Sequence, residues 1–273
     1  MPNWFMNKIT LLNMSKDENK ITQMLKDIKN EDALKKLGAE IDSMPEDELV
    51  TTYPTIDFNK VIPMPEALAI ESGSSSENGL NWWLYANRRT IPAAERMEPE
   101  LSDEDYKKVL EFPKWTKYEK VAEDELNKII SYGKDPKIVD IGTKAAHNII
   151  EYNAPTWYEW RYDNWGTKWN ANETQFTKSP NEIMFTTAWS PVIPIACELS
   201  RKYTDVLVTI AGADESFPEI CEPIMFLNGE EIESISEVDN PEQFWADIWG
   251  YDDEQMIDIA GWTEAYDTGE SEE

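Results

Sequence analysis

The sequence is poor in the residues that most metal sites and nucleophilic enzymes use. Its 273 residues include one histidine, His147, and two cysteines, Cys197 and Cys221. A single imidazole excludes any site that needs several histidine ligands. The two cysteines have neither the spacing of a metal-binding pair nor the density of a disulfide framework. We expect both thiols to be reduced, and His147 to lie in the core on a helical apolar face beside Ala146 and Ile149.

Long hydrophobic runs are also missing. No apolar run approaches the roughly 18 residues that a membrane-spanning helix needs, and the first residues, MPNWFMNK, lack the apolar segment of a signal peptide. Hydrophobic residues still make up 41% of the chain and aromatic residues 11%, which indicates a folded protein with a substantial core. We expect a cytoplasmic protein that binds no membrane.

Basic residues disappear after Lys202. Residues 203–273 contain 21 aspartates and glutamates and no lysine or arginine, whereas the first 202 residues contain 33 acidic and 25 basic residues. The negative electrostatic potential of such a segment repels nucleic acid and attracts basic partners. A surface that only improves solubility, or salt adaptation, is the alternative. Salt adaptation would make the whole chain acidic, so the segregation favours a surface with a binding role.

No catalytic or metal-binding signature accompanies this charge. The serines lack the G-x-S-x-G context of a hydrolase, and Cys197 has no indicated base. The cluster Asp252-Asp253-Glu254 with Asp258 offers carboxylate oxygens, but it lacks the ligand order and the glycine of a calcium-binding loop. We expect a protein that is not an enzyme and that holds no metal and no cofactor.

An aromatic block, YEWRYDNWGTKWNA at 158–171, is the feature around which the fold is expected to form. Gly166 can adopt the positive φ that ends a helix, and Trp165 and Trp169 would pack on either side of that corner. The alternative is a stacking platform for nucleic-acid bases beside Lys168. We favour packing, because the paired aromatics of the RNA-recognition signature are missing.

Periodicity and turn signals predict alternating helices and strands around this block. Asn228-Gly229 is the strongest hairpin signal in the chain, and Asn240 followed by Pro241 predicts a helix start. The segment 72–79, SGSSSENG, is expected to be a flexible loop. Helical spacing after Ser15 places Ile21, Met24, Leu25 and Ile28 on one face. The expected strands are 3–14, 167–177, 182–190, 205–211 and a hairpin within 223–236, and the later helices begin near 102, 118, 136, 194 and 240.

Four motifs together carry a family resemblance: MPNW at the start, FNKVIPMPEAL at 58–68, WYEWRYDNWGTKWNA at 157–171 and FTTAWSPVIP at 185–194. They resemble the YubB ferredoxin-like family of plasmid and phage proteins. The resemblance implies a ferredoxin-like βαβ–βαβ core, with its first strand near 4–13 and its first core helix within 137–165. It also implies a mobile-element origin in a bacterial host, and it supplies no mechanism.

The expected fold class is therefore α+β. A ferredoxin-like core with an added hairpin would comprise residues 1–14 and 137–237. A long, mainly helical insertion, 15–136, would follow the first strand, and an acidic C-terminal helix with a frayed tail would occupy 238–273.

We expect a phage- or plasmid-encoded, non-catalytic inhibitor of a host defence protein, such as a CRISPR effector or another nuclease. Its acidic surface would bind the partner's basic nucleic-acid site. The alternatives are an inhibitor or accessory protein that acts through the aromatic and insertion surfaces, and a nucleic-acid-binding or processing protein that uses the ferredoxin-like sheet. The residues expected to bind the partner are Glu230, Glu231, Glu233, Glu237, Glu242, Asp247, Asp252, Asp253, Glu254 and Asp258. Because Glu231 and Glu233 are two residues apart in an expected strand, both should point to the same face.

Overall fold

The chain forms two compact units. The computed structural model describes residues 3–36, 44–112, 121–175, 177, 179–252 and 255–256. One unit, here called the sheet unit, comprises Met1–Pro63 and Asn164–Glu273, and the other, the helical unit, comprises Met64–Asp163. Within the described residues, no helix has both the length and the apolar character needed to span a membrane.

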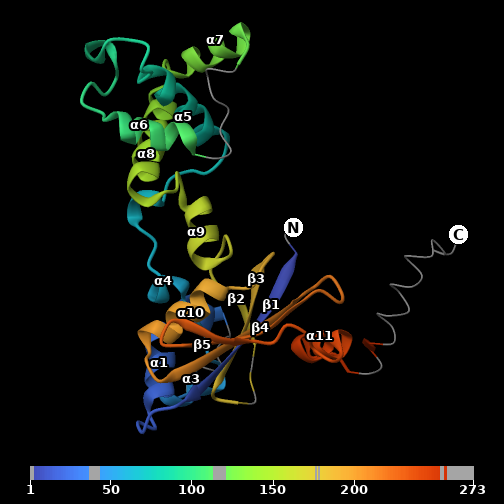
Figure 1. Ribbon diagram of the computed structural model, residues 1–273. Helices are drawn as coiled ribbons and strands as arrows, with labels where there is room; N and C mark the ends of the chain where they lie inside the picture. The colour runs from blue at the N-terminus through green and yellow to red at the C-terminus, as the bar shows by residue number, and fades with distance from the viewer. Residues whose placement is uncertain are drawn as a thin grey trace, which may run out of the picture. The chain divides into compact units, whose positions relative to one another are not determined.

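The sheet unit is built on six strands in the order β2-β3-β1-β4-β5-β6, with every neighbouring pair antiparallel (Figure 1). The expected hairpin at Asn228-Gly229 connects the last two strands. Both turn residues have positive φ, 53° and 82°, as a tight two-residue hairpin turn requires. The strands are β1 (Trp4–Asn13), β2 (Asn172–Gln175), β3 (Glu182–Ala188), β4 (Val206–Asp214), β5 (Ile220–Leu227) and β6 (Glu230–Ser234).

The first four strands have ferredoxin-like connectivity. β1 lies between β3 and β4, β2 lies outside β3, and the helix α10 (Ile193–Lys202) connects β3 to β4. This is the β2-β3-β1-β4 order of two interleaved βαβ units. β5 and β6 extend the sheet beyond β4. The expected α+β fold with a ferredoxin-like core and an added hairpin is confirmed.

One face of the sheet is covered by helices. In the second half of β1, buried residues alternate with partly exposed ones, so that Ile9 and Leu11 lie in the core while Lys8 and Thr10 lie on the opposite face. Besides α10, the helices on this side of the unit are α1 (Lys20–Ile28), α2 (Glu31–Lys36), α3 (Glu46–Thr52) and α4 (Phe58–Val61).

The resemblance implied a first core helix within 137–165, but the structure has α1 in that place. The apolar stripe of α1 is buried and contacts β1, and α4 lies between α1 and α10. Pro136 to Tyr152 instead belongs to the helical unit. The bounds of the units therefore differ from the expected ones, because residues 20–63 supply the apolar surface that covers the sheet.

The opposite face of the sheet, here called the open face, carries α11 (Pro241–Trp249) as its one helix among the described residues. As the sequence predicts, Asn240 caps it, accepting a hydrogen bond from the Gln243 amide at 3.1 Å. Its Trp245 is 3% exposed and packs with Met6 and Ala213, which face each other on β1 and β4. α11 is therefore part of the sheet unit and not a separate extension.

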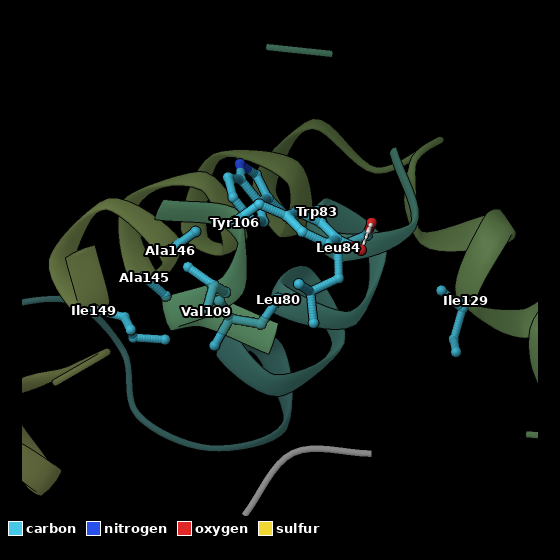
Figure 2. Close-up of a cluster of buried hydrophobic side chains, with 9 residues drawn as sticks. All are labelled: Leu80, Trp83, Leu84, Tyr106, Val109, Ile129, Ala145, Ala146 and Ile149. Carbon is cyan, nitrogen blue, oxygen red and sulfur yellow. Dashed lines mark hydrogen bonds between the residues drawn. The ribbon is translucent and has the colours of Figure 1, made fainter. Parts of the chain in front are cut away.

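The helical unit consists of short helices around the pair α5 and α8, which make its largest interhelical contact. Figure 2 shows its buried cluster, in which Trp83 and Tyr106 stack with ring centroids 6.3 Å apart. The other seven members are Leu80, Leu84, Val109, Ile129, Ala145, Ala146 and Ile149. The elements are the 3₁₀ turns Glu66–Leu68 and Ala93–Glu95 and the helices α5 (Ser74–Ala86), α6 (Asp103–Glu111), α7 (Glu123–Tyr132), α8 (Pro136–Tyr152) and α9 (Trp157–Trp165), whose last two residues belong to the sheet unit.

Two glycines allow α5 and α8 to cross closely. A Cβ on Gly79 would lie 2.5 Å from the Ile138 carbonyl oxygen, and a Cβ on Gly142 would lie 2.2 Å from the Gly79 carbonyl. The expectation of a flexible loop at 72–79 is therefore wrong, because α5 begins at Ser74. Gly79 serves a backbone-to-backbone helix contact and not chain flexibility.

Candidate partner-binding site

The β5–β6 hairpin holds the first three of the expected partner-binding carboxylates, and its turn is fixed against α10. The Gly229 amide donates to Ser200 Oγ at 2.9 Å, and the Asp205 amide donates to Asn228 Oδ1 at 3.1 Å. Arg201 donates from Nη2 to the Gly229 carbonyl at 3.3 Å, so its guanidinium binds the turn. Hydrogen bonds on both turn residues hold the hairpin in a defined position.

The glutamates of β6 lie on both faces of the strand. Glu231 is paired with Phe226 and Glu233 with Met225, and a register shift separates the two pairs. Cross-strand partners share a face and adjacent residues do not, so Glu231 and Glu233 point to opposite faces. The spacing of two residues predicted one shared face. That prediction is wrong, because a β-bulge at Ile232 inserts one residue between them.

Exposed carboxylates follow one another along the chain from β6 to the end of α11. Glu237 is exposed in the connection, Glu242 lies in the first turn of α11, and Asp247 is exposed one turn later. Asp247 accepts a hydrogen bond from Gln243 Nε2 at 3.0 Å, and Asp252 accepts one from the Gln255 amide at 2.9 Å.

Buried aromatic packing holds α11 and its carboxylates in place. Trp245 donates from Nε1 to the Asp214 carbonyl at 2.6 Å and stacks on Tyr251 with ring centroids 5.2 Å apart. Phe217 meets the Trp245 ring edge-on at 5.1 Å. α11 therefore fixes the positions of the carboxylates on its outer side.

Three of the ten expected residues, Asp253, Glu254 and Asp258, lie outside the described residues. The other seven are exposed, and we call them the acidic surface: Glu230, Glu231, Glu233, Glu237, Glu242, Asp247 and Asp252.

No basic side chain of the described residues forms an ion pair with the acidic surface. Carboxylates earlier in the chain do form ion pairs: Glu46 pairs with Lys29, and Asp103 pairs with Arg89. The hydrogen bonds that Lys29 donates to Glu46 and Glu31 outweigh the effect of burial and raise the pKa of Lys29 above its usual value. The charge of the acidic surface is therefore uncompensated in the described part of the chain.

The open face next to α11 has little positive charge. A hollow of about 380 Å³ there includes Glu173, Glu182 and Asp247 in its lining. Lys8 on the same face pairs with Glu182 at 3.2 Å. Carboxylates around this hollow repel phosphates, which argues against the sheet as a nucleic-acid platform.

Part of the aromatic block is exposed. Trp165 is fully buried and donates from Nε1 to the Ile62 carbonyl at 2.9 Å, as the packing interpretation predicts. Trp169 is 39% exposed, however, and Trp189 is 48% exposed, with Lys168 Nζ lying 4.2 Å from the Trp169 ring centroid. Trp4 lies against Trp169 with ring centroids 6.1 Å apart, and we call Trp4, Trp169 and Trp189 the aromatic patch. Nothing in the sequence around Trp189, which follows a buried strand, indicates its exposure.

The lone histidine is not in the core. His147 is exposed, and its Nε2 lies 3.1 Å from Glu98 Oε2, while Glu98 Oε1 accepts a hydrogen bond from Trp83 Nε1 at 2.6 Å. Its neighbours Ala146 and Asn148 are buried. The expectation of a core histidine is wrong, because one residue along a helix is a rotation of about 100°. No group of three or more His, Cys, Asp or Glu in the described residues has the arrangement of a metal site.

Both cysteines are free and half-buried. Burial, with a smaller contribution from Glu222, raises the pKa of the Cys221 thiol from 9.0 to about 11. We expect Cys221 in the folded protein to react with iodoacetamide about 100-fold more slowly at pH 8 than in urea, because only the thiolate attacks. The rate should rise as the pH approaches 11. Peptide-resolved mass spectrometry measures the alkylation rate of Cys221. Equal rates in the folded and the unfolded protein would contradict the raised pKa.

Comparison with known proteins agrees with this topology. Residues 164–260 match the family model described as the ferredoxin-like domain in Api92-like protein. The matched segment contains β2 to β6, α10 and α11, and hence all seven residues of the acidic surface. The name of this family model differs from that of the YubB family, which the sequence motifs resemble.

Among solved structures, the chain is similar to the crystal structure of a protein api92 from Yersinia pseudotuberculosis. The identity is 12%, the TM-score is 0.32, and the match covers 88% of this chain and 100% of that chain. No curated protein matches the sequence. Neither reported match describes an activity.

Proposed function

We propose that this protein is a non-catalytic inhibitor that binds the basic nucleic-acid site of a host defence protein, such as a CRISPR effector or another nuclease. The observation that carries the proposal is the acidic surface, whose exposed carboxylates form no ion pair with any basic side chain of the described residues. A basic channel evolved for phosphates attracts such a surface and is then closed to nucleic acid. The choice of a defence protein follows from the resemblance to plasmid and phage proteins.

The geometry supports a preformed surface. Hydrogen bonds fix the β5–β6 turn against α10, and Trp245 fixes α11 against the sheet. A preorganised charged surface loses little conformational entropy on binding. Its association with a basic partner should be fast at low salt and should slow as the ionic strength rises.

Neutralising part of the acidic surface tests the proposal. We expect a variant with Glu231→Gln, Glu233→Gln, Asp247→Asn and Asp252→Asn to associate with its target about tenfold more slowly at low salt. The difference should shrink as salt screens the charges. Surface plasmon resonance on a panel of purified defence nucleases measures the rate, with each nuclease also tested after loading with nucleic acid, which should block binding.

A matched control changes the net charge equally at another place. The exposed residues Glu104, Glu123, Asp124 and Glu125 of the helical unit are replaced by their amides. This control should bind nearly as well as the native protein. Equal losses in both variants would show that only the total charge matters, and no complex at low salt with any nuclease of the panel would refute the proposal.

A second candidate function uses the aromatic patch. Two half-exposed tryptophans beside Lys168 form a surface of the kind that anchors protein partners. An inhibitor or accessory protein acting through this patch would lose binding in Trp169→Ala and Trp189→Ala, and the acidic-surface variant would then bind normally. The same binding experiment thus separates the two candidates.

A further inference from the structure

The outer edge of β6 is the most accessible edge of the sheet. β6 is the last strand in the sheet order, all five of its side chains are exposed, and Ile232 is 54% exposed. Of the devices by which natural sheets prevent edge pairing, β6 has charged side chains and a β-bulge but no lysine and no proline. No strand of the described residues pairs with this edge.

Specific backbone groups of β6 point away from β5. The Ile235 amide donates to the Pro223 carbonyl at 3.0 Å, so it points toward β5. Because the direction alternates along an antiparallel strand, the N–H and C=O of Ser234 point outward. At the other end, Leu227 and Glu230 close the two-residue turn, which leaves the N–H and C=O of Glu231 pointing outward.

The β-bulge determines what can pair there. Glu231 lies on the same face as Phe226, and Glu230 and Glu233 lie on the other face, with Leu227 and Met225. Successive residues of an added strand would point to alternate faces and would meet a carboxylate on each. A second copy of β6 would place glutamates opposite glutamates, which is unfavourable. Charge complementarity therefore selects a partner strand with adjacent basic residues.

We propose that β6 binds its partner by strand addition, and that the added strand is an extended segment of a basic protein containing consecutive lysines or arginines. This inference rests on the proposed function and specifies how the acidic surface engages its target. Backbone hydrogen bonds to Glu231 and Ser234 supply the pairing, and carboxylates on both faces select the basic segment. The exposed Ile232 offers an apolar contact between them.

Two synthetic peptides of identical charge test the inference with the full chain. The first is acetyl-Val-Lys-Arg-Val-Lys-Arg-Val-amide. The second is the same peptide N-methylated at its middle valine and at the lysine that follows, which blocks both strand edges because successive N–H groups point to opposite edges. We expect the second to bind about tenfold more weakly, because strand pairing is lost while charge is kept. Amide exchange at Glu231 and Ser234, followed by NMR, should slow in the complex with the first peptide, while that at Ile235 should change little.

Protein variants separate pairing from charge. Ser234→Pro removes one outward N–H and should weaken binding of the first peptide, whereas Ser236→Pro, at an exposed position beyond β6, should not. Equal binding of both peptides, with no change in exchange at Glu231 and Ser234, would overturn strand addition even if basic nucleases are still bound through charge. No binding of either peptide would overturn it too, and the nuclease panel then decides the proposed function separately.

Discussion

Replacing Trp165 with alanine should destabilise the sheet unit by about 3–5 kcal/mol, the usual cost of removing a fully buried tryptophan. Its ring is completely buried and packs edge-on against Phe58 with centroids 5.6 Å apart, and Phe58 in turn packs against Phe185 of β3 at 5.8 Å. The substitution removes the side chain that joins α4 to the corner at Gly166. Hydrogen–deuterium exchange of Trp165→Ala, compared with that of the native protein under native conditions, measures the loss of stability. Peptides from β1, β3 and β4 should lose protection first.

Trp165→Phe separates the two contributions of this residue. Phenylalanine keeps much of the buried ring but removes the Nε1 hydrogen bond to the Ile62 carbonyl, so we expect a smaller loss of about 1–2 kcal/mol. Peptides from α5 and α8 should change less than those of the sheet. Native-like protection of β1 and β3 in Trp165→Ala would contradict the organising role of this tryptophan.

Gly142→Ala should destabilise the helical unit, although alanine favours helices over glycine by about 1 kcal/mol. The new methyl group would lie 2.2 Å from the Gly79 carbonyl, and a backbone cannot give way as a flexible side chain can. α5 and α8 would have to separate and open the packing around Leu80 and Ala145. We expect a net loss of about 2–3 kcal/mol, near the upper end of ordinary overpacking, measured as faster exchange in α5 and α8 peptides.

A matched control lies in the same helix. Lys137 is exposed in the first turn of α8, so Lys137→Ala should leave stability within about 0.5 kcal/mol of the native protein. Gly79→Ala should reproduce the effect of Gly142→Ala from the opposite helix. Stabilisation by Gly142→Ala would show that helix propensity outweighs the contact and that the two backbones do not touch.

These two variants also serve the functional tests. The acidic surface and the aromatic patch belong to the sheet unit, and the charge control lies in the helical unit. Gly142→Ala should therefore leave binding of a basic nuclease nearly unchanged while it loosens the helical unit. Trp165→Ala should weaken binding through loss of the sheet, which distinguishes a structural effect from loss of the acidic surface alone.

Much of the fold could be predicted from local signals. Asn228-Gly229 specifies a tight turn through positive φ, Asn240 with Pro241 specifies a helix start, and the apolar stripe of residues 21–28 specifies a helix with one buried face. Each is a property of a few neighbouring residues, and the tertiary structure left these three unchanged. The resemblance implied the βαβ–βαβ connectivity of the core, which no local signal contains.

The errors share a physical cause. His147 and Ala146 differ by one residue, and only the packing of α8 decides which of them faces the core. Gly79 is compatible with a loop or with a helix, and the approach of α8 selects the helix. Several segments of the chain are amphipathic and could cover β1. Core packing decides that α1 does so in place of a later helix, and no sequence pattern indicates this.

The sequence by itself determined the sign, the amount and the chain position of the charge, because these depend only on which residue stands at each position. It also determined the local turns and caps, since a few neighbouring residues are enough for those. Only the tertiary structure decided that the carboxylates of Glu231 and Glu233 lie on opposite faces of an exposed strand edge. The reason is the bulge at Ile232, a property of the pairing between β5 and β6 and not of either strand alone.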